Sequence, residues 1–316
     1  MLKTIGTHAL RALLVLLVVI VAVNHLVSLL PGDATMLLLG SDATEQQRAQ
    51  LRQTLGLDKS ELQRLGDWFA GVAHGDWGTS FASGRPVLQE IGSRLPVTLE
   101  VVLLGQTVAV VLAILIATVS VRHVNETADR VLSALSFLML SVPSFVIGLL
   151  LIYVFAVTLN VLPASGFTSF DKDPVGNLTD MIMPALTMGL GEAAVYARTL
   201  RGSLIATMSQ PYMDAAHARG IGPFKALWTR ALRPSSVSFV TLVGMNIGIA
   251  MGGSLIIENI FGIPGVGRLA ITALQGRDIP LLQGIVVFAA CAVLTMSILV
   301  DVAAYLINPR GASHDE

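Results

Sequence analysis

The sequence predicts an all-α polytopic membrane protein with six transmembrane helices and a small helical extracytoplasmic insertion between the first two. Three observations support this fold class. Hydrophobic residues make up 53% of the 316 residues and charged residues only 13%. The mean hydropathy is +0.73. Six stretches approach the roughly 20 apolar residues that cross a bilayer. A net charge of -1 gives no indication of nucleic-acid binding.

The six predicted spans are, in chain order, residues 12–30, 97–121, 131–159, 181–200, 237–257 and 284–307. The fourth is the least apolar, because it contains Pro184 and Glu192. Pro143 is expected to kink the third span. The fifth span carries small residues every four positions on one face, which predicts close packing against another helix. These small residues are Gly244, Gly248 and Gly252.

Basic residues set the predicted orientation. With the N terminus inside, eleven Lys and Arg residues fall in inner segments and three in the short outer loops. Loops rich in Lys and Arg stay in the cytoplasm, so both termini are predicted to be cytoplasmic. A cleaved signal peptide in the first span is the alternative, and it is disfavoured because no small-x-small site follows Val23.

The domain organisation follows from these spans. Residues 1–30 form the N-terminal tail and first span, 31–96 the extracytoplasmic helical loop, 97–310 a five-helix core that contains a cytoplasmic loop at 202–233, and 311–316 a tail. In the outer loop, Asp42 with Glu45 and Ser60 with Gln63 match the capping-box pattern and predict two helices. Such an insertion either docks a soluble partner or only covers the spans.

The loop between the fourth and fifth spans has helical texture. Tyr212, Ala215, Ala216 and Arg219 share one helical face, and the Gly-rich turn from Gly220 ends that helix. FKALWTRAL at 224–232 then predicts a second short helix. A basic loop is expected on the inner side in any case. The small-residue face and the aromatic residues favour a docking element for a cytoplasmic partner.

Intramembrane carboxylates and missing motifs limit the function classes. Glu100, Glu258 and Asp301 fall near predicted helix ends, where water can reach them, whereas Glu192 sits mid-span and is expected to face the bundle interior. It either lines a solute path or makes a structural hydrogen bond. The sequence contains no P-loop and no HExxH motif, so nucleotide hydrolysis and metalloprotease chemistry are not predicted for this chain.

Ordered motifs along nearly the whole chain resemble the dipeptide, oligopeptide and nickel permease family of ABC importers. The pattern of Asp214, Ala215 and Ala216 followed by Gly220 is similar to the EAA-type coupling motif of these permeases. The further motifs are LLPGD at 29–33, LGLD at 55–58, GDWGTSF at 75–81, RPVLQEI at 85–91, LPVTLE at 95–100, VPSF at 142–145, LPASG at 162–166, MPALTMGL at 183–190, IIENIFGIPGVGRLAITALQGRD at 256–278, the pair Val300 and Asp301, and NPR at 308–310. Four positions depart from the family pattern: Pro211, Pro234, Ser238 and Asn308.

The resemblance implies a permease subunit of an ATP-driven importer in the bacterial inner membrane, taking up peptides or nickel and metal chelates delivered by an extracytoplasmic binding protein. RPVLQEI and GGSLIIENIF lean toward the nickel branch. The implied partners are a second homologous permease, two ABC ATPase subunits that use Mg-ATP, the binding protein and the bilayer. No catalytic residue, metal site or cofactor is expected in this chain. The alternative is a stand-alone channel or ion-coupled secondary carrier, and an intramembrane hydrolase has little support.

Two groups of residues are expected to carry the implied function. The first would couple to the ATPase: Tyr212, Asp214, Ala215, Ala216, Arg219, Gly220 and Lys225. The second would line the solute path or the outer gate: Glu192, Asn246, Glu258, Phe261, Pro264 and Gly265. The last four lie in or beside the Gly- and Pro-containing turn that follows the fifth span.

Overall fold

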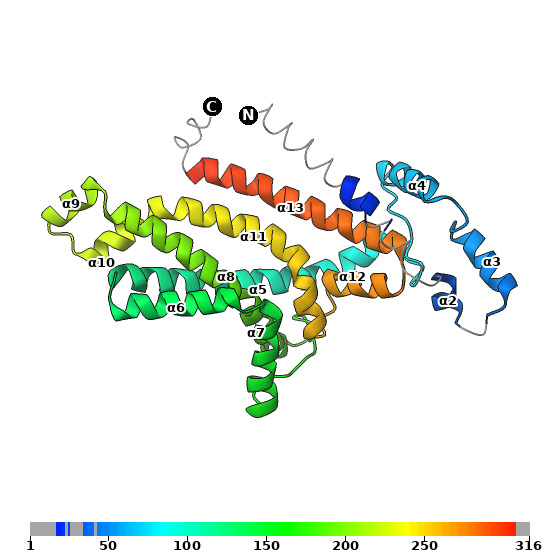
Figure 1. Ribbon diagram of the computed structural model, residues 1–316, viewed down its shortest axis with the longest axis horizontal. Helices are drawn as coiled ribbons and strands as arrows, with labels where there is room; N and C mark the ends of the chain where they lie inside the picture. Colours follow the sequence, from blue (N-terminus) through cyan, green and yellow to red (C-terminus); the bar gives the residue numbers. More distant parts are fainter. Residues whose placement is uncertain (1–16, 23–24, 26–33, 41–42, 308–316) are drawn as a thin grey trace. The chain divides into compact units, whose positions relative to one another are not determined.

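The computed structural model describes residues 17–22, 25, 34–40 and 43–307. The described residues form helices and one isolated antiparallel bridge between Thr79 and Pro86, which confirms the all-α prediction (Figure 1). The α-helices are α2 Ala34–Leu39, α3 Glu45–Thr54, α4 Glu61–Ala73, α5 Val87–Arg122, α6 Thr127–Ser141, α7 Ser144–Leu151, α8 Pro174–Met208, α9 Pro211–Ala218, α10 Pro223–Ala226, α11 Leu232–Ile260, α12 Val266–Gln275 and α13 Ile279–Ile307. Two π-helical segments, η1 Ile152–Thr158 and η2 Leu227–Ala231, continue α7 and α10.

The chain divides into two compact units. One comprises Met1–Val97 and Pro264–Leu294, and the other Thr98–Ile263 and Thr295–Glu316. The predicted domain boundaries at residues 30, 96 and 310 are not tested by this division. The LLPGD and NPR motifs and most of the predicted first span lie outside the described residues.

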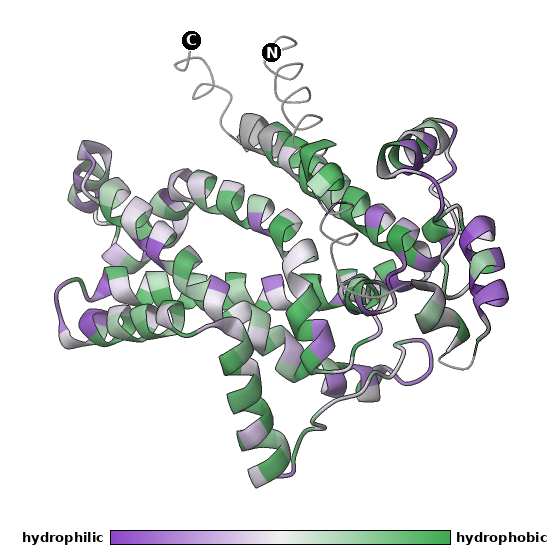
Figure 2. Cartoon of the chain, turned by 45° about the vertical axis from the view of Figure 1, so that its right-hand side comes forward, coloured by the Kyte–Doolittle hydropathy of each residue, from purple (hydrophilic) through white to green (hydrophobic). Residues whose placement is uncertain are grey.

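Three described helices are long and apolar enough to cross a membrane: Val87–Arg122, Pro223–Ile260 and Ile279–Val300. The bent pair of α6 with α7 and η1 makes a fourth if it is taken as one span. Figure 2 shows these helices mostly green, with α3 largely purple. Helix α8, which contains the predicted fourth span, has 35 residues but is not among these apolar helices. It is the span predicted to be the least apolar of the six. Six spans therefore remain a prediction.

The predicted third span is not one helix. Helix α6 ends at Ser141, α7 starts at Ser144, and the two are bent by 101°. Pro143 is the N-cap of α7, and Val142 before it is extended, with φ -95° and ψ 123°. Proline lacks the N–H of a continuing helix and disfavours a helical conformation in the residue before it. The bend expected at Pro143 is confirmed, and it is a break in the helix.

The prediction of a separate second short helix in the inner loop is also wrong. Helix α10 and η2 run directly into α11, so that Pro223–Ile260 is one long helix. The π-helical segment ends at Ala231, three residues before Pro234. A proline ring normally clashes with the carbonyl four residues earlier, here that of Arg230 inside η2. Widening the helix at this turn is a known way to keep a proline-containing helix continuous in a membrane.

The core of the second unit is rich in alanine. Ala109, Ala113 and Ala117 recur every four residues on α5 and are fully buried. Helix α8 packs against α6, α7 and α11. Where α5 meets α8, a Cβ atom added to Gly189 would lie 2.8 Å from the Gly105 carbonyl oxygen. Dispersion drives helix association in lipid, so this close approach of two backbones favours tight packing of α5 against α8.

The glycine face predicted on the fifth span is only partly a packing face. A Cβ atom on Gly244 would lie 2.1 Å from Val300 Cγ2, so this position does meet another helix, α13. Gly248 is buried as well. Gly252 has no atom within 4 Å of its would-be Cβ, so it meets no helix in the described part of this chain. Packing of Gly252 against a helix of a partner subunit stays a prediction. Helical spacing identified the face but not the length over which the two helices touch.

Two capped helices form part of the other unit. Ser60 and Gln63 make the predicted capping box at the start of α4. The box at α3 is made by Thr44 and Gln47, because α3 begins at Glu45, and the predicted pairing through Asp42 is therefore wrong. Asp42 itself lies outside the described residues. Lys59 donates to the Asp67 carboxylate at 2.6 Å, and this hydrogen bond and the carboxylate charge raise the pKa of Lys59.

Candidate functional site

Helix α9 is the short helix between α8 and α10 that carries the EAA-like pattern. Pro211 occupies the first helical turn, where its missing N–H has no helical partner to lose. The helix ends at Arg219, and Gly220 follows with φ +79°, a left-handed conformation that glycine adopts without strain. Pro223 then opens the next helix. The turn predicted from the Gly and Pro residues is confirmed at this position.

The two sides of α9 differ in exposure. Met213 is fully buried and Ala216 is 8% exposed, so both face the core of their own chain. Tyr212 is 47% exposed, and Asp214, Ala215 and Arg219 are exposed as well. Lys225 on α10 is also exposed. Ala216 of the predicted docking face turns into the core together with Met213, three residues earlier, and its role in coupling stays a prediction.

The buried Met213 side chain packs α9 against the long helices α8 and α11. This side chain belongs to one apolar cluster with Leu200 and Leu204 of α8, Ala226 of α10 and Phe239 of α11. The backbone N–H of Ile221 also donates to the Ala216 carbonyl at 3.1 Å. Because close-packed interiors transmit displacement with little deformation, a force on the exposed side of α9 would move the ends of α8 and α11 with it. In Figure 1, α8 and α11 lie next to each other and both extend to the end of the bundle that carries α9 and α10.

A polar cluster joins α5, α8 and α11 within their apolar segments. Glu192 accepts hydrogen bonds from the Gln106 side-chain amide and, at 3.3 Å, from the Tyr196 hydroxyl. The same hydroxyl lies 2.8 Å from Gln106 Oε1 and is hydrogen-bonded to Asn246. Glu192 and Asn246 are half-buried, whereas Gln106 and Tyr196 are buried. Glu192 thus faces the bundle interior, as expected, and makes the structural hydrogen bonds of the alternative interpretation.

Two predicted path residues are buried in the core instead. Glu258 is fully buried and accepts hydrogen bonds from Thr98 Oγ1 at 2.8 Å and Ser254 Oγ at 2.9 Å. The expectation that water reaches Glu258 at a helix end is wrong, because α11 continues to Ile260 and packs its last turn inward. Phe261 is 2% exposed, so it does not line an open path within this chain.

The remaining acidic candidates are placed as follows. Glu100 is half-buried, and it lies well inside α5 because that helix starts ten residues earlier than the predicted span. The expected helix-end position of Glu100 is therefore wrong. The Asp301 side chain lies outside the described part of the chain.

The turn after α11 links two of the ordered motifs. Gly262 has φ +70°, and Ile263 donates to the Glu258 carbonyl at 2.8 Å. The Phe261 carbonyl accepts from the Gly166 N–H at 3.0 Å, which joins this turn to the LPASG segment. Pro264 is half-buried, and Gly265 is buried as the N-cap of α12. The turn is tight, as predicted, and these two hydrogen bonds pair the carbonyl groups of Glu258 and Phe261 with protein donors.

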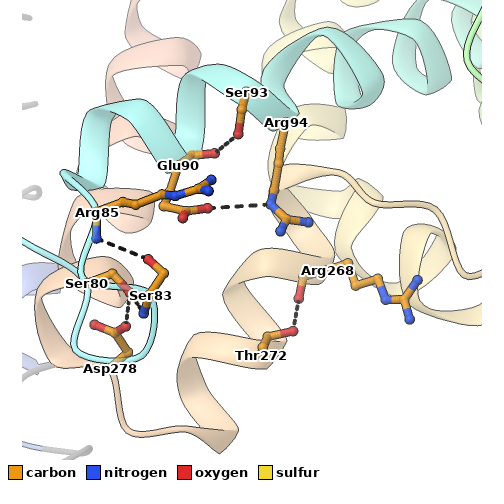
Figure 3. Close-up of polar contacts among 9 residues, drawn as sticks. All are labelled: Ser80, Ser83, Arg85, Glu90, Ser93, Arg94, Arg268, Thr272 and Asp278. Carbon is orange, nitrogen blue, oxygen red and sulfur yellow. Dashed lines mark hydrogen bonds and ion pairs between the residues drawn. The ribbon is translucent and has the colours of Figure 1, made fainter.

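Sequence reasoning missed a carboxylate that organises the first unit. Asp278 is 1% exposed and accepts from Ser80 Oγ at 2.5 Å and from the Ala82 N–H at 3.2 Å, as Figure 3 shows for the serine. It also accepts from the Leu281 N–H at 3.3 Å, at the start of α13. Asp278 therefore fixes the GDWGTSF loop to this helix start. An acid two residues before a proline is a helix-start signal that could have identified it.

A second missed cluster joins α5, α6 and α8. Arg201 Nε and Nη2 donate to the two oxygens of Asp129 at 2.9 and 2.7 Å. Ser120 also donates to Asp129, and the Asn125 N–H does so at 3.1 Å. Asp129 is 4% exposed, so its charge is offset by this two-pronged arginine contact. The pair lies 72 positions apart in sequence, and no spacing rule connects it.

Comparison with known proteins identifies relatives over nearly the whole length. The profile of the binding-protein-dependent transport system inner membrane component matches residues 109–312, and that of its N-terminal part matches residues 1–102. A peptide transport system permease protein of Brucella abortus is 34% identical over 300 residues, which covers 95% of this chain and 96% of the relative. The glutathione transport system permease protein GsiC of Salmonella choleraesuis is 35% identical over 294 residues, or 93% and 94% of the two chains.

Two solved structures share the fold. The inward-facing MetNI methionine ABC transporter matches with a TM-score of 0.58 at 15% identity, covering 70% of this chain and 97% of that chain. An amino acid ABC transporter crystallised with histidines matches with a TM-score of 0.53 at 19% identity, covering 68% and 93%.

Proposed function

Because this chain belongs to the binding-protein-dependent transport system inner membrane component family, and is thus the permease subunit of an ABC importer, we propose that it imports peptides. We also propose that an ATPase subunit contacts α9 and moves it. It is a multi-pass protein of the inner membrane, with ATPase and binding-protein partners. We place both termini, α9 and α10 on the cytoplasmic side, as the distribution of Lys and Arg indicates.

The proposed complex contains a second homologous permease and two ABC ATPase subunits that bind Mg-ATP. The observation that carries the coupling role is the division of α9 into two sides. Tyr212, Asp214, Ala215 and Arg219 are exposed for contact with an ATPase, while Met213 is locked into the core with α8 and α11. ATP-driven closure of the ATPase subunits would then move α9, and with it the ends of α8 and α11, as a rigid body.

The route of the solute is proposed to pass the polar cluster of Glu192 and Asn246. Both side chains are half-buried within the second unit, and they come from α8 and α11, the two helices that α9 joins. Movement of either helix relative to the other would rearrange the hydrogen bond between Tyr196 of α8 and Asn246 of α11. Polar groups in membrane spans commonly mark a transport pathway. We propose no catalytic reaction for this chain.

Peptides are the proposed solute, because the full-length relatives named above are peptide and glutathione permeases at 34% and 35% identity. The test is uptake into proteoliposomes that hold the copurified complex with ATP inside and the binding protein outside. We expect ATP-dependent uptake of a labelled di- or tripeptide that excess unlabelled peptide competes away. Uptake of a nickel chelate in the same vesicles without peptide uptake would contradict the assignment of the solute while leaving the importer class intact.

A further inference from the structure

A cavity of about 420 Å³ lies where the end of α5 meets α10. Thr118 of α5 and Leu227 of η2 are among its buried lining residues. Its wall includes Val119, Phe224 and Trp228, which are 44%, 63% and 42% exposed. Eight of its nine lining residues, all of them in the described part of the chain, are uncharged. The cavity is therefore an apolar pocket with an open aromatic side.

Arg122 is the charged residue among the nine that line this pocket. The Arg122 guanidinium lies 5.8 Å from the centroid of the Phe224 ring, and the Phe224 and Trp228 rings meet edge to face at 6.3 Å. Arg122 is exposed, and so is Lys225 on the same short helix as Phe224. The nearest acid in sequence is Glu126, whose Oε2 lies 2.8 Å from His123 Nδ1. A cation beside an aromatic pair and an apolar pocket is complementary to an anionic amphiphile.

An exposed apolar stripe on α5 leads into the pocket. Val111, Leu115 and Val119 are spaced four residues apart, so they lie along one side of the helix, and they are 44–53% exposed. The stripe runs through the apolar part of α5 and ends one turn before Arg122. Its length and composition suit an acyl chain, with the phosphate at the arginine.

We propose that this pocket binds an anionic phospholipid of the cytoplasmic leaflet, with its phosphate at Arg122 and an acyl chain along the α5 stripe. This proposal rests on the topology proposed above, which puts α10 at the cytoplasmic surface. Anionic lipids are concentrated in that leaflet, and tryptophan is typical of the interface. The exposed side of α9 contacts the ATPase in this account, and the pocket formed by α5 and α10 remains for lipid.

The test uses Trp228 as a reporter inside the intact complex. The chain contains three tryptophans, Trp68, Trp77 and Trp228, so the Trp68→Phe, Trp77→Phe variant leaves only the pocket residue in this subunit. In the partner subunits, each tryptophan is replaced either by phenylalanine or by a fluorotryptophan whose emission is shifted. The emission of Trp228 can then be measured separately. The complex is placed in nanodiscs in which brominated phosphatidylglycerol or brominated phosphatidylcholine is present at the same low mole fraction.

We expect the brominated phosphatidylglycerol to occupy the pocket about fivefold more than the phosphatidylcholine, the preference that one nearby arginine supplies. Arg122→Gln should remove this preference, whereas Arg130→Gln, an exposed arginine of α6 outside the pocket, should keep it. Equal quenching by both lipids, or an unchanged preference in Arg122→Gln, would overturn the proposal. Absence of quenching by either lipid would also overturn it, because a protein partner would then fill the pocket.

The same preparations separate this proposal from the proposed function. Lipid preference is read from fluorescence without ATP, whereas importer function is read from ATP-dependent peptide uptake. Native mass spectrometry of the Arg122→Gln complex provides a second readout, in which phosphatidylglycerol retained by the unmodified chain should be lost. Retention equal to that of the unmodified chain would count against the site even if the tryptophan variant failed to fold.

Discussion

At the scale of single residues, close contacts between backbones decide where the spans meet. Gly189 on α8 lies so near α5 that a Cβ atom there would also be 2.6 Å from Val108 Cγ1. Gly191, two residues along the same helix, has no atom within 4 Å of its would-be Cβ. The two glycines are therefore a matched pair, because the same substitution adds the same atoms to the same helix.

Gly189→Ala is expected to destabilise the protein by about 1–3 kcal/mol, the usual cost of forcing extra volume into a packed site. The clash with the Gly105 carbonyl cannot be relieved by rotating a side chain. Gly191→Ala should leave stability unchanged or raise it slightly, because alanine favours a helix over glycine. Thermal unfolding in one detergent measures both. Equal midpoints for the two variants would contradict the α5–α8 packing.

Residue-level predictions succeeded where local chemistry decides the outcome. The turn that begins at Gly220, the Ser60 capping box and the inward orientation of Glu192 followed from sequence alone. The burial of Glu258 did not, because it depends on a hydrogen bond to Thr98, which lies 160 positions away. Long-range pairing of this kind leaves no periodic signal in the sequence.

At the scale of elements, α9 carries the main functional prediction. Ala215 and Ala216 are neighbours, but Ala215 is exposed and Ala216 is 8% exposed. Ala215→Glu should reduce ATP-dependent uptake at least tenfold while the unfolding midpoint stays unchanged, because it adds charge and bulk only to the proposed ATPase contact. That tenfold loss corresponds to about 1.4 kcal/mol of contact energy. Uptake and thermal unfolding are measured on the same preparation.

Ala216→Glu serves as the contrasting variant. It places a carboxylate in the apolar cluster around Met213, so stability itself should fall. Normal uptake in Ala215→Glu, at normal expression, would show that the exposed side of α9 does not contact the ATPase.

The Asp278 tether gives a second prediction for an element. Asp278→Ala removes the acceptor for Ser80 Oγ and for the Ala82 and Leu281 N–H groups. The GDWGTSF loop should then be cleaved after Phe81 by chymotrypsin several times faster in intact right-side-out vesicles. Asp278→Asn, which keeps one acceptor oxygen, should lie between the variant and the unmodified chain. An unchanged cleavage rate in Asp278→Ala would contradict the tether.

Element boundaries were the part of the fold that sequence predicted least well. Hydropathy found α5, α11 and α13, but α5 begins ten residues before its apolar window and α10 with η2 runs directly into α11. Amphipathic or basic turns at the end of a span carry no apolar signal, although the helix continues through them. The Asp42 pairing failed for a related reason, because Thr44 and Gln47 fit the same pattern and the structure uses them.

At the scale of the whole molecule, we propose that the chain depends on an external energy source. Its sequence has no P-loop, and its family works with ATPase and binding-protein subunits. The apolar helices and the full-length relatedness to peptide permeases agree with an importer permease, which we propose is driven through its short helix α9. A stand-alone channel or carrier would need neither an exposed docking helix nor its rigid connection to α8 and α11.

The most direct measurement is a gentle-detergent purification of this chain from its native membrane, followed by mass spectrometry of the proteins that accompany it. The account predicts a second permease and P-loop ATPase subunits, and it predicts that Ala215→Glu keeps the permease but loses most of the ATPase. If the chain is recovered alone and still moves solute across liposomes without ATP, the importer account is contradicted.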